Sequence, residues 1–184
     1  MKLFKNLSII CIVLTVFNSC KSDDDTPEPV NAEEVITTMI INLVGGGSTV
    51  TLESRDLDGD GPNDPVIEVS GNLVSGTSYS GTVQFLNETE SPAEDITIEV
   101  EEESDEHQVM FVLGTGLDGT IAYGNEDDNG NPLGTQFSLT PNAAGNGNFT
   151  VVLRHEPTKP NDGTLSGAGG ETDISATFDL TFEN

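Results

Sequence analysis

The sequence predicts a mostly β fold, an antiparallel β-sandwich of the immunoglobulin-like kind with about eight or nine strands. Short runs of β-branched and aromatic residues recur along the chain, and Gly, Asn and Asp residues separate them. Several runs alternate apolar and polar residues, as strands with one buried face do. The β-α alternation of a parallel sheet is missing. We expect residues 34–184 to form one such domain, since a chain of 184 residues has a single domain as its natural prior.

The expected strands follow one another with turn residues between them. In residues 48–54 (STVTLES), Val50 and Leu52 share one face, and the three glycines at 45–47 separate this run from the one before, so the first two strands should form a hairpin. The full set of expected strands is residues 35–44, 48–54, 66–69, 79–86, 108–113, 120–123, 134–140, 148–154 and 172–182.

Residues 90–107 carry signals for both a helix and a strand. Ser91 suits an N-cap, Pro92 the first helical position and Glu94 the third, and the acidic side chains that follow suit the positive end of the helix dipole. Residues 96–100 (ITIEV) nevertheless alternate as a strand would. Because the capping signals agree with one another, we predict one inserted short helix near residues 92–105.

The start of the chain has the pattern of an export leader. Lys2 and Lys5 are its only charged residues, and residues 7–17 (LSIICIVLTVF) form an apolar run. That run is too short to span a bilayer, which takes about 20 residues. Residues 17–20 (FNSC) resemble a lipobox, in which the cysteine becomes the acylated N-terminus. We expect residues 1–19 to be a lipoprotein signal peptide; the alternative is an ordinary signal peptide with a chance cysteine.

Cys20 is the one cysteine that remains once the leader is removed, so the mature chain cannot form an internal disulfide, and lipidation gives the residue a purpose. Residues 21–25 (KSDDD) resemble the acidic export signal that sends many Bacteroidota-type lipoproteins to the outer face of the outer membrane. The alternative is a solvated acidic linker. We expect residues 20–33 to be an acidic flexible tether, and the protein to be lipid-anchored in the outer membrane, facing the cell surface rather than the periplasm.

The charge of the mature chain excludes some partners. With Lys2 and Lys5 in the leader, 4 basic and 32 acidic residues remain from Cys20 onward, a net charge of −28. Nucleic acid is excluded because its phosphates would be repelled, and an anionic membrane surface would be repelled too. Cations are the expected counterpart, either as a diffuse cloud or as bound ions, and solubility is the simpler reading of the charge.

One acidic loop resembles a calcium site. Asp56, Asp58 and Asp60 supply oxygen atoms at every second residue ahead of a glycine, and Asp64 adds a further carboxylate. An EF-hand would need a glutamate at the twelfth position, where Ile67 stands, so this is not an EF-hand. We expect either a calcium ion that staples the loop through the four aspartates or an Asx-rich turn without an ion.

Both histidines lie in acidic contexts at the ends of expected strands. His107 begins one strand and His155 ends another, and two strand ends at one edge of a sandwich can meet. Glu103 precedes His107 by one helical turn, and Glu156 follows His155. These four side chains would suit zinc, with nitrogen and oxygen ligands in fourfold geometry, or copper, with Met110 nearby in the sequence. The alternative is two surface histidines beside a solvated acidic helix.

Motifs for catalysis are missing. The chain has no G-x-S-x-G motif, no cysteine nucleophile after leader removal, and no Gly-rich phosphate loop between a strand and a helix. It has no tryptophan and only two tyrosines, which argues against a sugar-binding module. We therefore expect a protein that is not an enzyme.

From residue 35 to its end, the chain is similar to a group of small Bacteroidota surface lipoproteins of unknown role. Some of these are labelled type 1 periplasmic-binding-fold proteins, a two-domain α/β fold that the β pattern here contradicts. The resemblance implies work beside a TonB-dependent outer-membrane receptor. We expect a non-enzymatic lipoprotein that binds a divalent metal as an accessory to such a transporter, or else a structural or adhesive sandwich with a calcium-stapled loop. The segments that carry the resemblance are residues 55–61, 105–108, 154–163 and 169–174.

Overall fold

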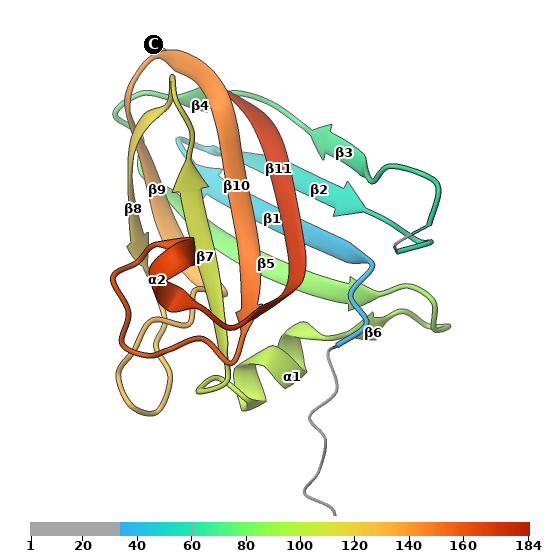
Figure 1. Cartoon of the computed structure of the whole chain (residues 1–184). Coiled ribbons are helices and arrows are strands. Elements are labelled where there is room, and N and C mark those ends of the chain that lie inside the picture. Colours follow the sequence, from blue (N-terminus) through green and yellow to red (C-terminus); the bar gives the residue numbers. More distant parts are fainter. Residues whose placement is uncertain (1–33, 60) are drawn as a thin grey trace, which may run out of the picture. The chain divides into compact units, whose positions relative to one another are not determined.

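Two β-sheets pack face to face in the computed structural model, which describes residues 34–59 and 61–184 (Figure 1). The predicted leader, Cys20 and the tether lie outside the described residues, as does Asp60. The strands are β1 (Thr38–Gly45), β2 (Ser48–Arg55), β3 (Val66–Val69), β4 (Leu73–Val74), β5 (Tyr79–Asn87), β6 (Glu94–Asp95), β7 (His107–Leu113), β8 (Asp118–Tyr123), β9 (Gln136–Ala143), β10 (Gly145–His155) and β11 (Glu171–Glu183).

The larger sheet has the order β3-β2-β1-β5-β9-β8, with β6 beside β5, and the smaller sheet has the order β4-β11-β10-β7. Neighbouring strands are antiparallel except for β4 and β11, which run parallel over two residues. The mostly β class and the antiparallel sandwich are therefore confirmed. All nine expected strands are present with ends shifted by a few residues, and the two-residue strands β4 and β6 bring the described total to eleven.

The core lies between the sheets and takes side chains from both. Alternation along each strand directs every second residue inward, as in β5, where buried and less buried residues alternate along the strand. The core side chains that are fully buried include Met39, Ile41, Leu43, Leu52 and Phe85 from the larger sheet, and Phe149, Val151, Leu153 and Phe178 from the smaller sheet.

The predicted helix is shorter than expected. Helix α1 spans Thr97–Glu102, and its N-cap is Ile96, which makes no side-chain capping bond, rather than Ser91. The reason is that the residues before it belong to the sheet: β6 pairs with the end of β5, and the Ile96 N–H donates to the Phe85 carbonyl. Residues 94–96, which a helix starting at Ser91 would have included, thus pair their backbone with β5 instead.

A second helix, α2 (Leu165–Ala168), was not expected from the sequence. Its N-cap is Thr164, whose hydroxyl accepts a hydrogen bond from the Gly167 N–H. Neither helix resembles a membrane span, because within the described residues no helix is long and apolar enough to cross a bilayer.

Candidate metal centre

The two histidines meet at one end of the smaller sheet. Strand β7 begins at His107 and β10 ends at His155, and the antiparallel register places these residues directly opposite each other. Side chains of directly opposed residues project from the same face of a sheet. The imidazole rings are therefore stacked, with centroids 4.9 Å apart and planes inclined by 28°. His107 is completely buried and His155 is 5% exposed, so neither is the surface histidine of the alternative interpretation.

A β-bulge brings Asp173 to this pair. Along the β10–β11 ladder, Leu153 is opposite Ile174 but Arg154 is opposite Thr172, so the register shifts by one residue at Asp173. An extra residue of this kind re-aims a side chain out of the regular alternation. The Asp173 side chain is fully buried, and its Oδ1 lies 3.5 Å from Nδ1 of His155 while its Oδ2 lies 3.8 Å from Nε2 of His107.

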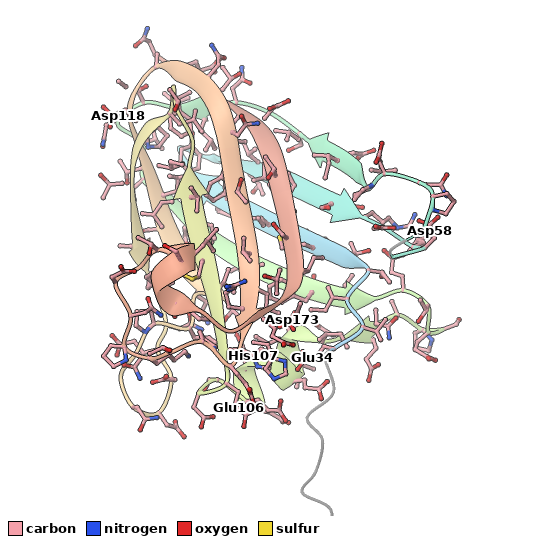
Figure 2. The ribbon with its side chains drawn as sticks, in the orientation of Figure 1. Glu34, Asp58, Glu106, His107, Asp118 and Asp173 are labelled. Atoms are coloured by element: carbon pink, nitrogen blue, oxygen red, sulfur yellow. The ribbon has the colours of Figure 1, made fainter. Side chains whose placement is uncertain are left out.

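Glu34 completes the group from the segment that leads into β1, in the other sheet. Its side chain is 3% exposed; Oε1 lies 3.0 Å from His107 Nε2, and Oε2 lies 3.9 Å from His155 Nδ1. One ligand atom from each of the four residues lies within 4.8 Å of the others. Figure 2 shows Glu34, His107 and Asp173 gathered near α1, below the ends of β10 and β11. We call Glu34, His107, His155 and Asp173 the central cluster.

The central cluster has the types of ligand that surround a zinc ion. Four atoms held about 2.0–2.1 Å from a zinc ion at tetrahedral angles are about 3.3–3.4 Å from one another. The nitrogen–oxygen distances in the central cluster run from 3.0 to 3.9 Å, and each carboxylate approaches the two histidines with different oxygens. Rotation of the carboxylates would bring one oxygen of each to a shared ion.

The two ring nitrogens of His107 have different surroundings. Nδ1 lies 3.2 Å from the backbone carbonyl of Glu103, and because a carbonyl only accepts, Nδ1 is the donor of this contact. Nε2 makes no hydrogen bond although Glu34 Oε1 is only 3.0 Å away. Without a proton, Nε2 offers a lone pair to a metal ion. A backbone carbonyl behind the ring is also the usual outer partner of a metal-bound histidine.

The described basic residues are engaged away from Glu34. Arg55 pairs with Glu88, Lys159 pairs with Asp127, and Arg154 donates to the Gly169 carbonyl. Burying a carboxylate costs several kcal/mol, and a close opposite charge is needed to offset this cost. A divalent cation between Glu34 and the imidazoles would provide that charge.

The two glutamates predicted as ligands lie just outside the central cluster. Glu103 converges with Glu34 and Glu99, and Glu156 converges with Glu106 and His155. Burial first, and then the charges of Glu34 and Glu103, raise the pKa of Glu99. The structure thus brings together the predicted histidines, but the carboxylates nearest to both of them are Glu34 and Asp173.

A cavity of about 370 Å³ opens beside the central cluster. Glu34 and Asp173 line one part of it, and Asp56, Gly59 and Pro65 line another. The predicted calcium loop and the central cluster therefore share one opening. Asp56 is the one described aspartate of the loop that lines this cavity, together with Glu34 and Asp173 of the central cluster.

Within the calcium loop itself, the described aspartates take part in turn hydrogen bonds. The Asp58 N–H donates to the Asp56 carboxylate in an Asx turn, and Asn63 donates to the Asp58 carboxylate. Among the described residues, Asp56, Asp58 and Asp64 belong to none of the groups whose ligand atoms converge. Calcium at this loop stays a prediction, since Asp60 lies outside the described residues.

Met110, which the sequence placed near the site as a copper ligand, is on the other side of β7. Successive residues of a strand face opposite sides, so Met110 shares its side with Gln108 and not with His107. On that side, Gln108 accepts a hydrogen bond from Asn161, in the segment that leads to α2. The thioether therefore takes no part in the central cluster.

No protein-family model matches the chain, and neither a curated protein nor a solved structure matches it. The chemistry of the site is therefore read from its geometry. Two nitrogen and two oxygen ligands from four side chains fill a tetrahedral set. A set closed by four protein ligands is typical of binding and structural sites, since catalytic zinc keeps one position open for water or substrate.

Proposed function

We propose that this protein binds one divalent transition-metal ion, zinc in the first place, through Glu34, His107, His155 and Asp173. The observation that carries the proposal is the 3.0 Å approach of His107 Nε2 to Glu34 Oε1 without a hydrogen bond between them. A zinc ion between these atoms would make a coordination bond to each of them.

We place zinc before copper because zinc prefers a tetrahedral set, whereas cupric ions prefer a square-planar or tetragonal one. Two imidazoles and two carboxylates form a mixed nitrogen and oxygen set, and zinc accepts both types at about 2.0–2.2 Å in tetrahedral geometry. Copper proteins that transfer electrons use cysteine together with histidine, and soft sulfur ligands select cuprous ions. The described residues include no cysteine, and Met110 faces away from His107.

We further propose that the protein does this work as a lipoprotein held by acyl chains on Cys20, outside the cell at the outer membrane. In this role it is not an enzyme: it captures the ion and passes it to a TonB-dependent transporter. The leader pattern and the acidic segment after Cys20 support this localisation, and the strongly acidic composition supports a cation as the transported ligand. The side cavity would serve as the path for the ion.

The test is a titration of the full-length protein, purified in detergent and stripped of metal with a chelator, by zinc, copper and calcium. We expect one zinc ion per chain, and X-ray absorption should show nitrogen and oxygen ligands at about 2.0–2.1 Å without sulfur. A variant with both His107→Ala and His155→Ala should lose this binding, whereas Glu90→Gln, at an exposed glutamate that belongs to none of the converging groups, should keep it.

Two outcomes would contradict the proposal. Zinc that binds the double-histidine variant as tightly as the wild type would belong to another site. Calcium binding without zinc or copper binding would favour the other interpretation of the sequence, a structural or adhesive sandwich whose 56–64 loop is stapled by calcium.

A further inference from the structure

A second group of carboxylates adjoins the central cluster and shares Glu34 with it. Glu99 lies in the first turn of α1, and Glu103 is the residue that caps its C-terminal end. Residues four apart on a helix lie on the same side, so both side chains reach Glu34. One carboxylate oxygen from each of the three residues lies within 4.8 Å of the others. We call Glu34, Glu99 and Glu103 the α1 carboxylate cluster.

Two oxygens of this cluster are buried without a hydrogen-bond donor. The side chain of Glu34 is only 3% exposed, and its Oε2 has no hydrogen-bond partner; His155 Nδ1, at 3.9 Å, is too far away to be one. Oε2 of Glu103 is also buried without a hydrogen-bond partner. A buried carboxylate oxygen ordinarily accepts at least one hydrogen bond, so these two atoms point to a cation as their partner.

A hollow of about 380 Å³ lies on the outer side of the α1 carboxylate cluster. Glu99 and Glu103 line it together with Glu94, Asp95 and Glu102. Its lining is thus rich in acidic side chains, and it has room for water molecules. An ion held by the cluster could complete its coordination shell with water on that side.

We propose that the α1 carboxylate cluster binds a second, hard divalent cation of the calcium class, with Glu34 bridging the two ions; this rests on the proposed zinc site for the first ion. Oε1 of Glu34 faces His107 and the first ion, and Oε2 is available to the second. The ligands differ in kind, because the central cluster offers nitrogen and oxygen whereas the α1 cluster offers oxygen alone. Calcium takes six to eight oxygen ligands, and three carboxylates with water supply them.

The experiment uses the full-length protein loaded with zinc and titrated with calcium by calorimetry, while bound zinc is measured separately by metal analysis. We expect calcium to bind in addition to zinc, within the range of about 10⁻⁴–10⁻³ M that extracellular calcium modules show. A Glu99→Gln, Glu103→Gln double variant should keep its zinc and lose at least about tenfold in calcium affinity. Glu90→Gln, at an exposed glutamate outside the α1 carboxylate cluster and outside the hollow, should bind calcium within about threefold of wild type.

Glu34→Gln tests the bridge, since it should lose both ions. Wild-type protein that binds zinc but no calcium up to about 10 mM, a concentration above the dissociation constants of the weakest extracellular calcium modules, overturns the second site. That result leaves the zinc proposal intact. The second site is also overturned by calcium binding that survives in the Glu99→Gln, Glu103→Gln variant and disappears in Asp58→Asn, because that ion belongs to the 56–64 loop. If Glu34→Gln keeps calcium while it loses zinc, the bridge is wrong. Wild-type protein that fails to bind zinc contradicts the proposed function itself.

Discussion

If zinc binds as proposed, Glu34→Gln should remove most of the stability that the ion gives the fold, while it leaves the metal-free fold intact. The substitution keeps the size and shape of the side chain and replaces the charged ligand oxygen by a neutral amide. Glu34 lies near both histidines and belongs to both the central cluster and the α1 carboxylate cluster. The loss of its charge should therefore weaken ion binding in both clusters.

The expected magnitude follows from mass action. Free zinc at 100 times the dissociation constant stabilises the folded wild type by about 2.7 kcal/mol. In a protein of this size, 1 kcal/mol raises Tm by about 2–4 °C, so zinc should raise the wild-type Tm by about 5–11 °C. Changing a residue that hydrogen-bonds to a metal ligand weakens metal binding by about 10–100-fold, so losing the ligand itself should weaken binding at least about 100-fold. At the same free zinc, the variant then gains no more than about 0.4 kcal/mol, or 1–2 °C.

The measurement is thermal unfolding followed by circular dichroism, with free zinc held by a metal buffer and with matched samples in chelator. Glu90→Gln makes the same chemical change at an exposed glutamate in the loop between β5 and β6 and should show the full wild-type rise. Equal zinc-dependent rises for Glu34→Gln and the wild type would refute Glu34 as a ligand. No rise in the wild type at saturating zinc would refute the whole centre.

Three further predictions concern other parts of the fold. Hydrogen bonds from Arg55, and then from Thr38, lower the pKa of Glu88 from its ordinary 4.5 to about 2. Because the pKa is lower in the folded state, the Arg55–Glu88 pair stabilises the fold above about pH 4.5, and this stabilisation is lost as the pH falls toward 2. Urea unfolding at several pH values should therefore show a smaller loss on acidification in Arg55→Met than in wild type, and equal losses would contradict it. Phe149→Ala, at a fully buried core position, should lower the free energy of unfolding by about 3–5 kcal/mol in urea; a loss below 1 kcal/mol would argue against this core. Asp56→Asn, at the shared cavity, should slow zinc association at low salt but not at 1 M salt, where the Debye length is about 3 Å; stopped-flow rates equal to wild type at low salt would exclude this path.

The sequence predicts the strands of this protein well because their signal is local. Alternation in residues 48–54 and 79–86 already distinguishes the inner from the outer face, and β2 and β5 form there. The helix near 92–105 was misplaced at its start because local capping signals at Ser91 and Pro92 competed with pairing to β5, which is a contact between distant parts of the chain. Tertiary hydrogen bonds decide such cases, and no local pattern reports them.

The candidate site divides in the same way. His107 and His155 could be expected to meet because each lies at the end of an expected strand. Asp173 reaches them through a bulge, which shifts the side-chain alternation by one residue, and a sequence that reads as regular strand gives no sign of it. Glu34 comes from the segment before β1, on the other sheet, so its position follows only from the packing of the two sheets. Of the two predicted glutamates, Glu156 converges with His155 and Glu106, whereas Glu103 converges with Glu34 and Glu99.

The position of Glu34 also determines how the sandwich would respond to mechanical force. It is the first described residue of the chain and lies ahead of β1 in the sequence. In a protein held at Cys20 as proposed, tension carried along the backbone would reach Glu34 before β1. If Glu34 binds the ion as proposed, such tension would act on a metal ligand before it acted on the hydrogen bonds between β1 and β5.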